Sequence, residues 1–418
     1  MKLLSILPVA VLLKVARGFS HYPSASYNAE SCSQKRHGNQ HGLLRFDTNL
    51  CSTPFSEEFI CEKGSLQQEY AVPSPRVIQK VEKFARLPVW PAWNGVLIFV
   101  IQRIFGEVVA AKVEETIGGR VCPNFYAPEA TSPFIMLVHH SHSFFGLDPL
   151  RYFQRTFFPE GFPAHPHRGF VTVTYILKGG FSHRDSLGIK QLYGAEERHA
   201  GKHTQWLTTG AGMLHEEMFD IQGLWSRQEL YQIWLNLPAS QKLCAPNVDL
   251  LGADECPVVE KDGCKTIVIS GKFDGEKSAA PNLSDVSILH VKVATGANWK
   301  HLLPASHQTA ILYVRQGSIQ IGSTTILPHY TVYFEKQGNE LSITSDVGAD
   351  FMLLSGAPLN EPVSAQGSMV MNTPGEINQA YADYQMQKMG VPWDHKISDG
   401  QWNEHIQNFK SIYGVREK

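Results

Sequence analysis

The chain has 418 residues, a formal net charge of −2 and 43% hydrophobic residues. A chain of this length can bury the cores of two domains, and its near-neutral charge excludes the basic footprint of a nucleic-acid-binding protein. The seven cysteines are odd in number and show no C-x-x-C spacing, which excludes a disulfide framework as the main source of stability.

The first 18 residues have the pattern of a signal peptide. Lys2 precedes an apolar run over residues 3–13, and residues 16–18 have the small-residue pattern of a cleavage site. The alternative is an amphipathic N-terminal helix, because Lys14 interrupts the apolar character. The serine-rich, acid-poor segment that follows is typical of transit peptides, so we expect entry into the secretory pathway and delivery to a plastid or out of the cell.

Residues 19–110 lack β patterning and are interpreted as the targeting segment and a loosely structured extension. Between Val96 and Val113 the apolar residues recur at helical spacing, which predicts a short amphipathic helix packed on the core. No stretch reaches the roughly 18 apolar residues that cross a bilayer, so we expect no transmembrane segment.

After Gly118 the chain shows short β-branched and aromatic runs separated by Gly, Pro or Asp. The connections are too short for crossover helices, which favours a β-sandwich or barrel. A polar stretch from Pro238 to Cys264 divides this region, so we expect an all-β fold of two packed jelly-roll barrels, at residues 115–240 and 260–392. The predicted strands are Phe134–Val138, Phe170–Leu177, Leu230–Leu237, Thr266–Ser270, Val286–Val293, Ala310–Val314, Ser318–Ile321 and Thr331–Phe334.

A C-terminal helix is predicted after the last strand. Thr373 and Glu376 have the spacing of a capping box around Pro374 at the first helical position, and Gly390 is the predicted stop. This helix should cover a barrel face or the interface between the barrels, and residues 393–418 form a tail.

Two His-x-(His/Glu) pairs carry the predicted chemistry: His165 with His167, and His215 with Glu217. On a strand, residues i and i+2 project from the same face, so each pair can direct two ligands at one point. Three imidazoles and one carboxylate suit Fe(II) and, less selectively, Mn, Ni, Cu or Zn. The alternative reading of a lone His-x-His is an exposed or hydrogen-bonded pair.

Neighbouring residues narrow this hypothesis. Strand periodicity places Glu217 on the face of His215 and turns Glu216 away. A zinc protease motif would require a histidine where the chain has Phe219.

Other histidines are weaker candidates. His139, His140 and His142 could form a second metal site or line the cavity mouth, although loop histidines bonded to the backbone are the simpler interpretation. His183 and Asp185 fit a structural turn. The second β half contains no His-x-His, so we expect no metal there.

Several long motifs, in order, resemble the pirin family of the cupin superfamily. They are Gly161–Gly179, Phe181–Gly188, Gln205–Met218, Gly356–Val363, Val370–Thr373 and Ala380–Tyr384. The resemblance implies a bicupin whose N-terminal barrel holds one iron through His165, His167, His215 and Glu217, with the second pair on a strand across the barrel from the first. One departure is Val171, where pirins usually carry Glu; its loss would remove a polar group near the cavity.

The resemblance also implies quercetin 2,3-dioxygenase activity on a small aromatic or flavonoid-like substrate. In that reading Glu217 is the catalytic residue, acting as the base that takes the substrate proton. The rival hypothesis is a non-enzymatic, metal-dependent regulatory protein that binds a protein partner. A storage-like bicupin is weakest, since such a protein does not require four ligands at one locus.

Overall fold

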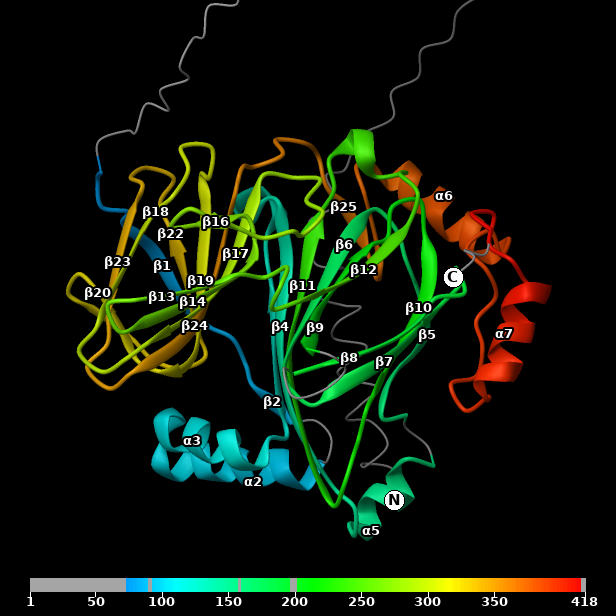
Figure 1. Ribbon diagram of the computed structural model, residues 1–418, viewed down its shortest axis with the longest axis horizontal. Helices are drawn as coiled ribbons and strands as arrows, with labels where there is room; N and C mark the ends of the chain where they lie inside the picture. The colour runs from blue at the N-terminus through cyan, green and yellow to red at the C-terminus, as the bar shows by residue number, and fades with distance from the viewer. Residues whose placement is uncertain (1–72, 89–91, 157–158, 196–200, 415–418) are drawn as a thin grey trace, which may run out of the picture.

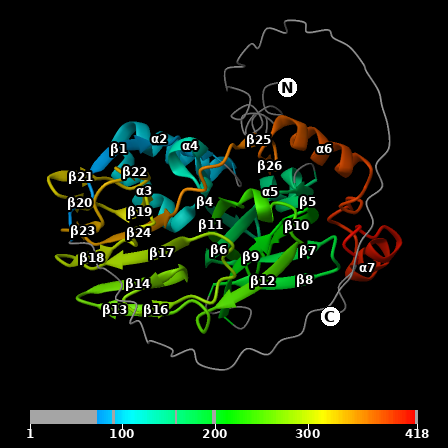
Figure 2. The ribbon, with the colours of Figure 1, turned by 90° about the horizontal axis from the view of Figure 1, so that it is seen from above.

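A computed structural model describes residues 73–88, 92–156, 159–195 and 201–414 (Figure 1). Two β-barrels lie side by side, with the N-terminal barrel in green and the C-terminal barrel in yellow and orange (Figures 1 and 2). The expected all-β fold of two packed barrels is therefore confirmed, and each of the eight predicted strand segments forms a strand. The predicted signal peptide and residues 19–72 lie outside the described residues.

The N-terminal barrel consists of a seven-stranded and a four-stranded antiparallel sheet. Its two sheets enclose aromatic and aliphatic side chains such as Ile176, Phe181 and Tyr193. The larger sheet has the order β12 (Asn247–Gly252), β9 (Lys202–Thr208), β6 (Phe170–Lys178), β11 (Trp225–Asn236), β4 (Phe134–Phe145), β3 (Arg120–Phe125) and β2 (Leu87–Pro88). The smaller has the order β5 (Gly161–His167), β10 (Met213–Phe219), β7 (Gly180–Asp185) and β8 (Lys190–Gly194).

The C-terminal barrel repeats this plan. Its larger sheet has the order β1 (Ile78–Lys83), β22 (Tyr330–Phe334), β19 (Thr309–Gly317), β24 (Ala349–Gly356), β17 (Val286–Val293), β14 (Cys264–Ser270) and β13 (Val258–Lys261). The smaller has the order β18 (Asn298–Leu302), β23 (Glu340–Thr344), β20 (Ile319–Ile321) and β21 (Thr324–Ile326). Two short ribbons, β15 (Lys272–Phe273) with β16 (Glu276–Lys277) and β25 (Ser364–Gln366) with β26 (Met369–Met371), complete the strands.

The two seven-stranded sheets pack face to face, so the barrels share one buried core. Val173 and Ile233 of the N-terminal barrel belong to the same cluster as Ile288, Ile311 and Met352 of the C-terminal barrel. Burying apolar side chains stabilises by roughly 25 cal/mol per Å², so this shared cluster holds the barrels together. Strand β6 has one face in this interface and the other inside the N-terminal barrel.

The described part of the extension is not loosely structured, so that prediction is wrong from Ile78 onward. Strand β1 joins the edge of the C-terminal barrel, where Val81 pairs with Val332. Its side chains are mostly exposed or half-buried, so the sequence shows no clean alternation. Backbone hydrogen bonds, rather than an apolar face, fix this edge strand. Strand β12 likewise extends the N-terminal barrel beyond residue 240.

The predicted helix between residues 96 and 113 is two helices, α2 (Ala92–Phe105) and α3 (Glu107–Ile117). Gly106, with φ 84°, separates them. Ile98 and Ala110 are buried, but Ile104 and Phe105 are about two-thirds exposed at 65% and 64%. The prediction that an apolar face packs on the core is thus only partly right. Helix α2 is apolar on several sides, and only one of them is buried. Among the described residues, no helix is long and apolar enough to cross a membrane.

The C-terminal helix is confirmed as α6 (Pro374–Gln385), with both capping-box hydrogen bonds between Thr373 and Glu376. It ends before the predicted stop at Gly390. The tail contains a further helix, α7 (Asp399–Asn408), and both helices pack with Leu214 against the outside of β10. They flank the N-terminal barrel in Figures 1 and 2. Within the described ranges, the other helical segments are α4 (Pro128–Thr131), α5 (Pro149–Gln154) and η2 (Ala239–Gln241).

Candidate metal centre

Strands β5 and β10 bring three of the four predicted ligands together. The strands are antiparallel neighbours, with His165 opposite His215 and His167 opposite Met213. The expectation that the two pairs face each other across the barrel is therefore wrong: they belong to one sheet. The ring of His167 lies 5.1 Å from Phe170 and 5.4 Å from Trp234, both on the other sheet, so the imidazoles point into the barrel.

The three imidazoles are spaced as ligands of one ion would be. One nitrogen from each of His165, His167 and His215 lies within 4.8 Å of the other two. The Nε2 atoms of His165 and His167 are 3.1 Å apart. Two nitrogens held about 2.1 Å from one ion at a right angle are about 3.0 Å apart, so this spacing fits a shared metal.

The hydrogen bonds of the ring nitrogens also fit a metal. His165 Nδ1 donates to the carbonyl oxygen of Pro163 at 2.8 Å, which leaves the lone pair on Nε2. His215 is 0% exposed, and neither of its ring nitrogens has a hydrogen-bond partner. His167 Nδ1 is also unpartnered. Buried polar atoms are nearly always bonded, so an imidazole without partners indicates a ligand that completes it.

The electrostatics keep these imidazoles neutral. Burial lowers the pKa of His165, and it lowers the pKa of His167 and His215 well below the ordinary value. Neighbouring imidazoles lower the pKa of His215 further. A neutral imidazole offers a lone pair to a cation, so the site is prepared for a metal near neutral pH.

Glu217, the fourth predicted ligand, lies outside this group of donor atoms. It is fully buried, and its Oε1 accepts hydrogen bonds from Thr174 Oγ1 at 3.1 Å and from the Tyr193 hydroxyl at 3.0 Å. Its Oε2 accepts from Gln232 Nε2 at 3.0 Å. These donors from β6, β8 and β11 hold the carboxylate away from the imidazoles, so ligation and proton transfer by Glu217 stay predictions.

The prediction that Glu216 and Glu217 point to opposite faces of β10 is confirmed. The Glu216 carboxylate pairs with Arg184 of β7, whereas Glu217 is bonded to residues inside the barrel. Alternation along the strand therefore distinguishes these adjacent acids, as the sequence predicted.

His183 is closer to the centre than a turn residue would be. Its Nε2 lies 3.1 Å from Asp185 Oδ2, its Nδ1 has no partner, and its ring is 5.5 Å from that of His215. Asp185 fits its predicted role in a turn, because its Oδ1 accepts from the backbone N–H groups of Leu187 and Ile189. The His183-x-Asp185 spacing is the sequence signal that could have placed this imidazole beside the ligands.

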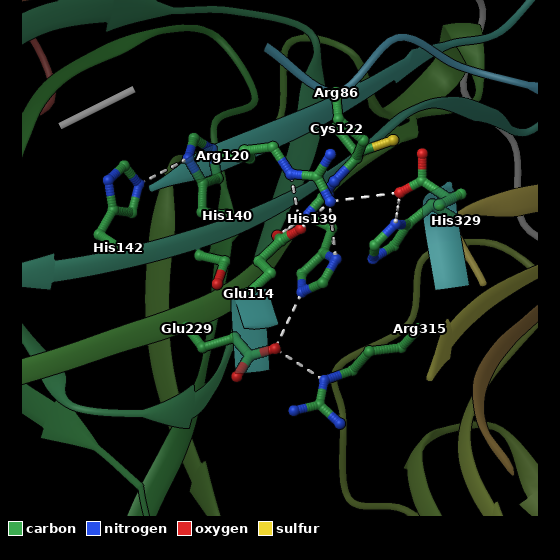
Figure 3. Close-up of polar contacts among 12 residues, drawn as sticks. Arg86, Glu114, Arg120, Cys122, His139, His140, His142, Glu229, Arg315 and His329 are labelled. Atoms are coloured by element: carbon green, nitrogen blue, oxygen red, sulfur yellow. Dashed lines mark hydrogen bonds and ion pairs between the residues drawn. The ribbon is translucent and has the colours of Figure 1, made fainter. Parts of the chain in front are cut away.

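His139, His140 and His142 lie on strand β4, so their assignment to a loop is wrong. His139 faces the C-terminal barrel, where its Nε2 lies 3.1 Å from Glu229 Oε1 (Figure 3). His140 and His142 face the other way, with 3.3 Å between the Nδ1 of His140 and the Nε2 of His142. The three side chains therefore do not converge on one point.

Val171 is also placed differently from expectation. It is 1% exposed and belongs to the core cluster between the barrels, on the opposite face of β6 from Thr174. The side chain therefore packs against the C-terminal barrel and not inside the N-terminal barrel, where the three imidazoles lie.

The family is shown by two matches along the chain. Residues 116–235 match the family model described as Pirin, and residues 288–390 match the pirin C-terminal cupin domain. The chain belongs to the pirin family.

Relatives and solved structures agree with this membership. The chain is 34% identical to pirin of Mus musculus over 313 residues, covering 70% of this chain and 97% of the mouse protein. It is 34% identical over 268 residues to a candidate quercetin 2,3-dioxygenase of Pseudomonas aeruginosa, covering 62% of this chain and 87% of the bacterial protein. A crystal structure of quercetin 2,3-dioxygenase from Acinetobacter baumannii shares the fold, with a TM-score of 0.61 and 24% identity. The match covers 76% of this chain and 99% of the Acinetobacter chain.

Proposed function

We propose that this pirin is a mononuclear metal protein whose N-terminal barrel oxidises a flavonol-like aromatic substrate with O2. The observation that carries the proposal is the convergence of three imidazoles, of which those of His167 and His215 are buried and that of His215 has no protein partner at either ring nitrogen. The similarity to a candidate quercetin 2,3-dioxygenase supports the substrate class.

His165, His167 and His215 would hold the ion. Nitrogen ligands with an available carboxylate suit Fe(II) best among common metals, and Mn, Ni, Cu or Zn less selectively. When bound, the metal would supply a Lewis acid beside an ionised substrate oxygen and a redox partner for O2. Three protein ligands, or four with Glu217, leave room for substrate on a six-coordinate ion.

Glu217 is the residue we propose to take the substrate proton. Its Oε1 accepts two hydrogen bonds and its Oε2 only one, so Oε2 retains acceptor capacity. A buried carboxylate inside the same barrel as the ligands would be the base that removes a hydroxyl proton from a bound flavonol. Thr174, Tyr193 and Gln232 would orient it.

The test combines metal analysis with O2 consumption. Purified protein is analysed by elemental mass spectrometry, loaded with Fe(II) without air, and then mixed with quercetin in an O2 electrode. We expect one ion per chain and O2 uptake that requires both iron and quercetin. The His215→Ala variant should lose both the bound ion and the O2 uptake.

Two results would contradict the proposal. Absence of bound metal after loading would remove the metal centre. One iron per chain without O2 uptake would remove the dioxygenase activity, and would favour the rival hypothesis of a metal-dependent regulatory protein with a protein partner.

A further inference from the structure

A second concave site lies between the barrels, away from the imidazoles of the metal centre. It is a cleft of about 460 Å³, formed by β6, β9 and β11 on one side and by β13, β14 and β17 on the other. Four cationic side chains line it: Lys178, Arg227, Lys265 and Lys292. Among the described residues, no aspartate or glutamate does. Its volume is in the range of small-molecule sites.

The wall from the C-terminal barrel carries two lysines in direct opposition. Lys265 of β14 pairs with Lys292 of β17 in the register of the sheet, and both line the cleft. Like charges directly opposite each other destabilise a sheet. Lys265 has an outer partner, Glu260 at 3.2 Å, and Lys292 has Asp350 opposite on β24. These acids flank the pair, so the lysines themselves remain adjacent like charges.

The wall from the N-terminal barrel also has more cations than anions. On this wall Lys178 Nζ and Arg227 Nη2 share one carboxylate, that of Glu229, at 3.2 and 3.9 Å, and Arg315 Nε of β19 in the C-terminal barrel reaches the same carboxylate at 2.8 Å. Figure 3 shows Glu229 between His139 and Arg315. One carboxylate cannot neutralise three cations, so positive charge remains beside the cleft.

Nearby acids do not cancel this excess. Asp350 accepts from Arg315 at 2.9 Å and lies 3.0 Å from His290 Nε2. Beside the lining residue Ala253, Asp254 and Glu255 are both paired with Lys202. Among the described residues, the five cations Lys178, Arg227, Lys265, Lys292 and Arg315 thus face four carboxylates: those of Glu229, Glu260 and Asp350, and that of Asp262 in the adjoining hollow that Lys265 and Lys292 also line.

The floor of the cleft is ordered and partly aromatic. Tyr175 and His290 come from opposite barrels, and the Tyr175 hydroxyl lies 2.9 Å from His290 Nδ1. Ile267 adds apolar surface, and the partly exposed Trp225 also lines the cleft. A polar pair on an apolar floor, ringed by cations, suits a compact organic anion better than a bare ion.

We propose that the cleft binds a small organic anion with two charged groups of the phosphate or carboxylate class, bridging the barrels. One charged group would be met by Lys178 and Arg227, and the other by Lys265 and Lys292. Such a ligand would relieve the repulsion between the opposed lysines. This site is independent of the metal centre: Tyr175 faces the cleft, whereas its neighbour Thr174 faces Glu217 inside the barrel.

The test uses isothermal titration calorimetry of the full chain with two probes, inorganic pyrophosphate and citrate, at low salt. We expect saturable binding with one site per chain, because charge-assisted hydrogen bonds are strongest in such a cleft. Preference for pyrophosphate identifies a phosphate ligand, and preference for citrate a carboxylate ligand. No saturable binding of either probe overturns the proposal.

Variants locate the site. Lys265→Gln, Lys292→Gln and Lys178→Gln should each weaken binding about tenfold, the loss expected for one charged hydrogen bond. Lys300→Gln, an exposed lysine on β18 outside the cleft, is the matched control and should bind like the unaltered protein. Equal weakening in Lys300→Gln, or weakening from one wall only, would overturn the proposal.

Folding is checked separately on the ligand-free variants. Replacing one of two opposed lysines removes repulsion, so Lys265→Gln and Lys292→Gln should keep or raise the melting temperature. A lowered melting temperature in both would mean that the lysines serve the fold, and this too would overturn a binding role.

Discussion

At the residue scale, the centre depends on His215, a buried imidazole whose two ring nitrogens have no protein partner. Leaving a buried polar group unbonded costs about 1–3 kcal/mol, and a bound ion would offset this cost for the one ring nitrogen of His215 that coordinates it. The same burial lowers the pKa of all three histidines and keeps them available as ligands. Structure and chemistry thus indicate one cation.

Metal retention should distinguish His215 from His183. His215→Ala should abolish retention of one ion per chain, because it removes a ligand. His183→Ala should leave most of it, because His183 Nε2 is bonded to Asp185 and the residue is not in the ligand group. Elemental analysis after gel filtration measures both, and equal metal loss in the two variants would mean that the effect is on folding.

Glu217→Gln tests whether this acid is the fourth ligand. Removing an interaction that tunes or completes a metal site typically lowers metal affinity about 10–100-fold, and we expect a loss of that size. Glutamine keeps the size of the side chain and can accept from Gln232 or the hydroxyls. Competition with a chelator measures the affinity. An unchanged dissociation constant would restrict the ligands to the three histidines.

At the element scale, sequence reasoning found the regular strands and missed the irregular ones. Short runs of β-branched and aromatic residues predicted β6, β17 and β19, whereas β5 carries two prolines, Pro163 and Pro166, which disfavour a strand assignment. The pairing of β5 with β10 depends on long-range contacts that local periodicity does not encode. The ligand residues were therefore predictable, but their placement on neighbouring strands was not.

The role of β1 predicts how far the chain can be shortened. A form starting at Pro73 keeps β1, whereas one starting at Arg86 lacks it and exposes the edge of β22. At a net 0.5–1.5 kcal/mol per hydrogen bond, the free energy of unfolding of the shorter form should be lower by about 3 kcal/mol. Its open sheet edge also favours aggregation. Thermal unfolding of the two forms measures this. Equal melting temperatures would mean that β1 contributes nothing.

At the scale of the whole molecule, two barrels are held by one shared core, and His139 and His290 each contact a tyrosine of the other barrel. Burial lowers the pKa of His139 and of His301 to about 4. In the unfolded chain such groups titrate near 6.5. Between about pH 6.5 and 4 the unfolded chain therefore binds more protons, so stability falls as the pH is lowered.

The melting temperature of the metal-free protein should thus be highest near neutral pH and decline from pH 7 to pH 4. His301 packs beside Phe273 and Trp299, with ring centroids 5.2 and 5.5 Å away, so His301→Phe can occupy the same space without binding a proton. This variant should show a shallower decline in differential scanning calorimetry. A melting temperature independent of pH over this range would contradict the inference.

The most direct measurement of the central claim is X-ray absorption at the iron edge of the Fe(II)-loaded protein. We expect one iron per chain with the scattering of three imidazoles at about 2.1 Å, and loss of that pattern in His165→Ala. An iron surrounded only by oxygen ligands, or an unchanged imidazole count in His165→Ala, would contradict it.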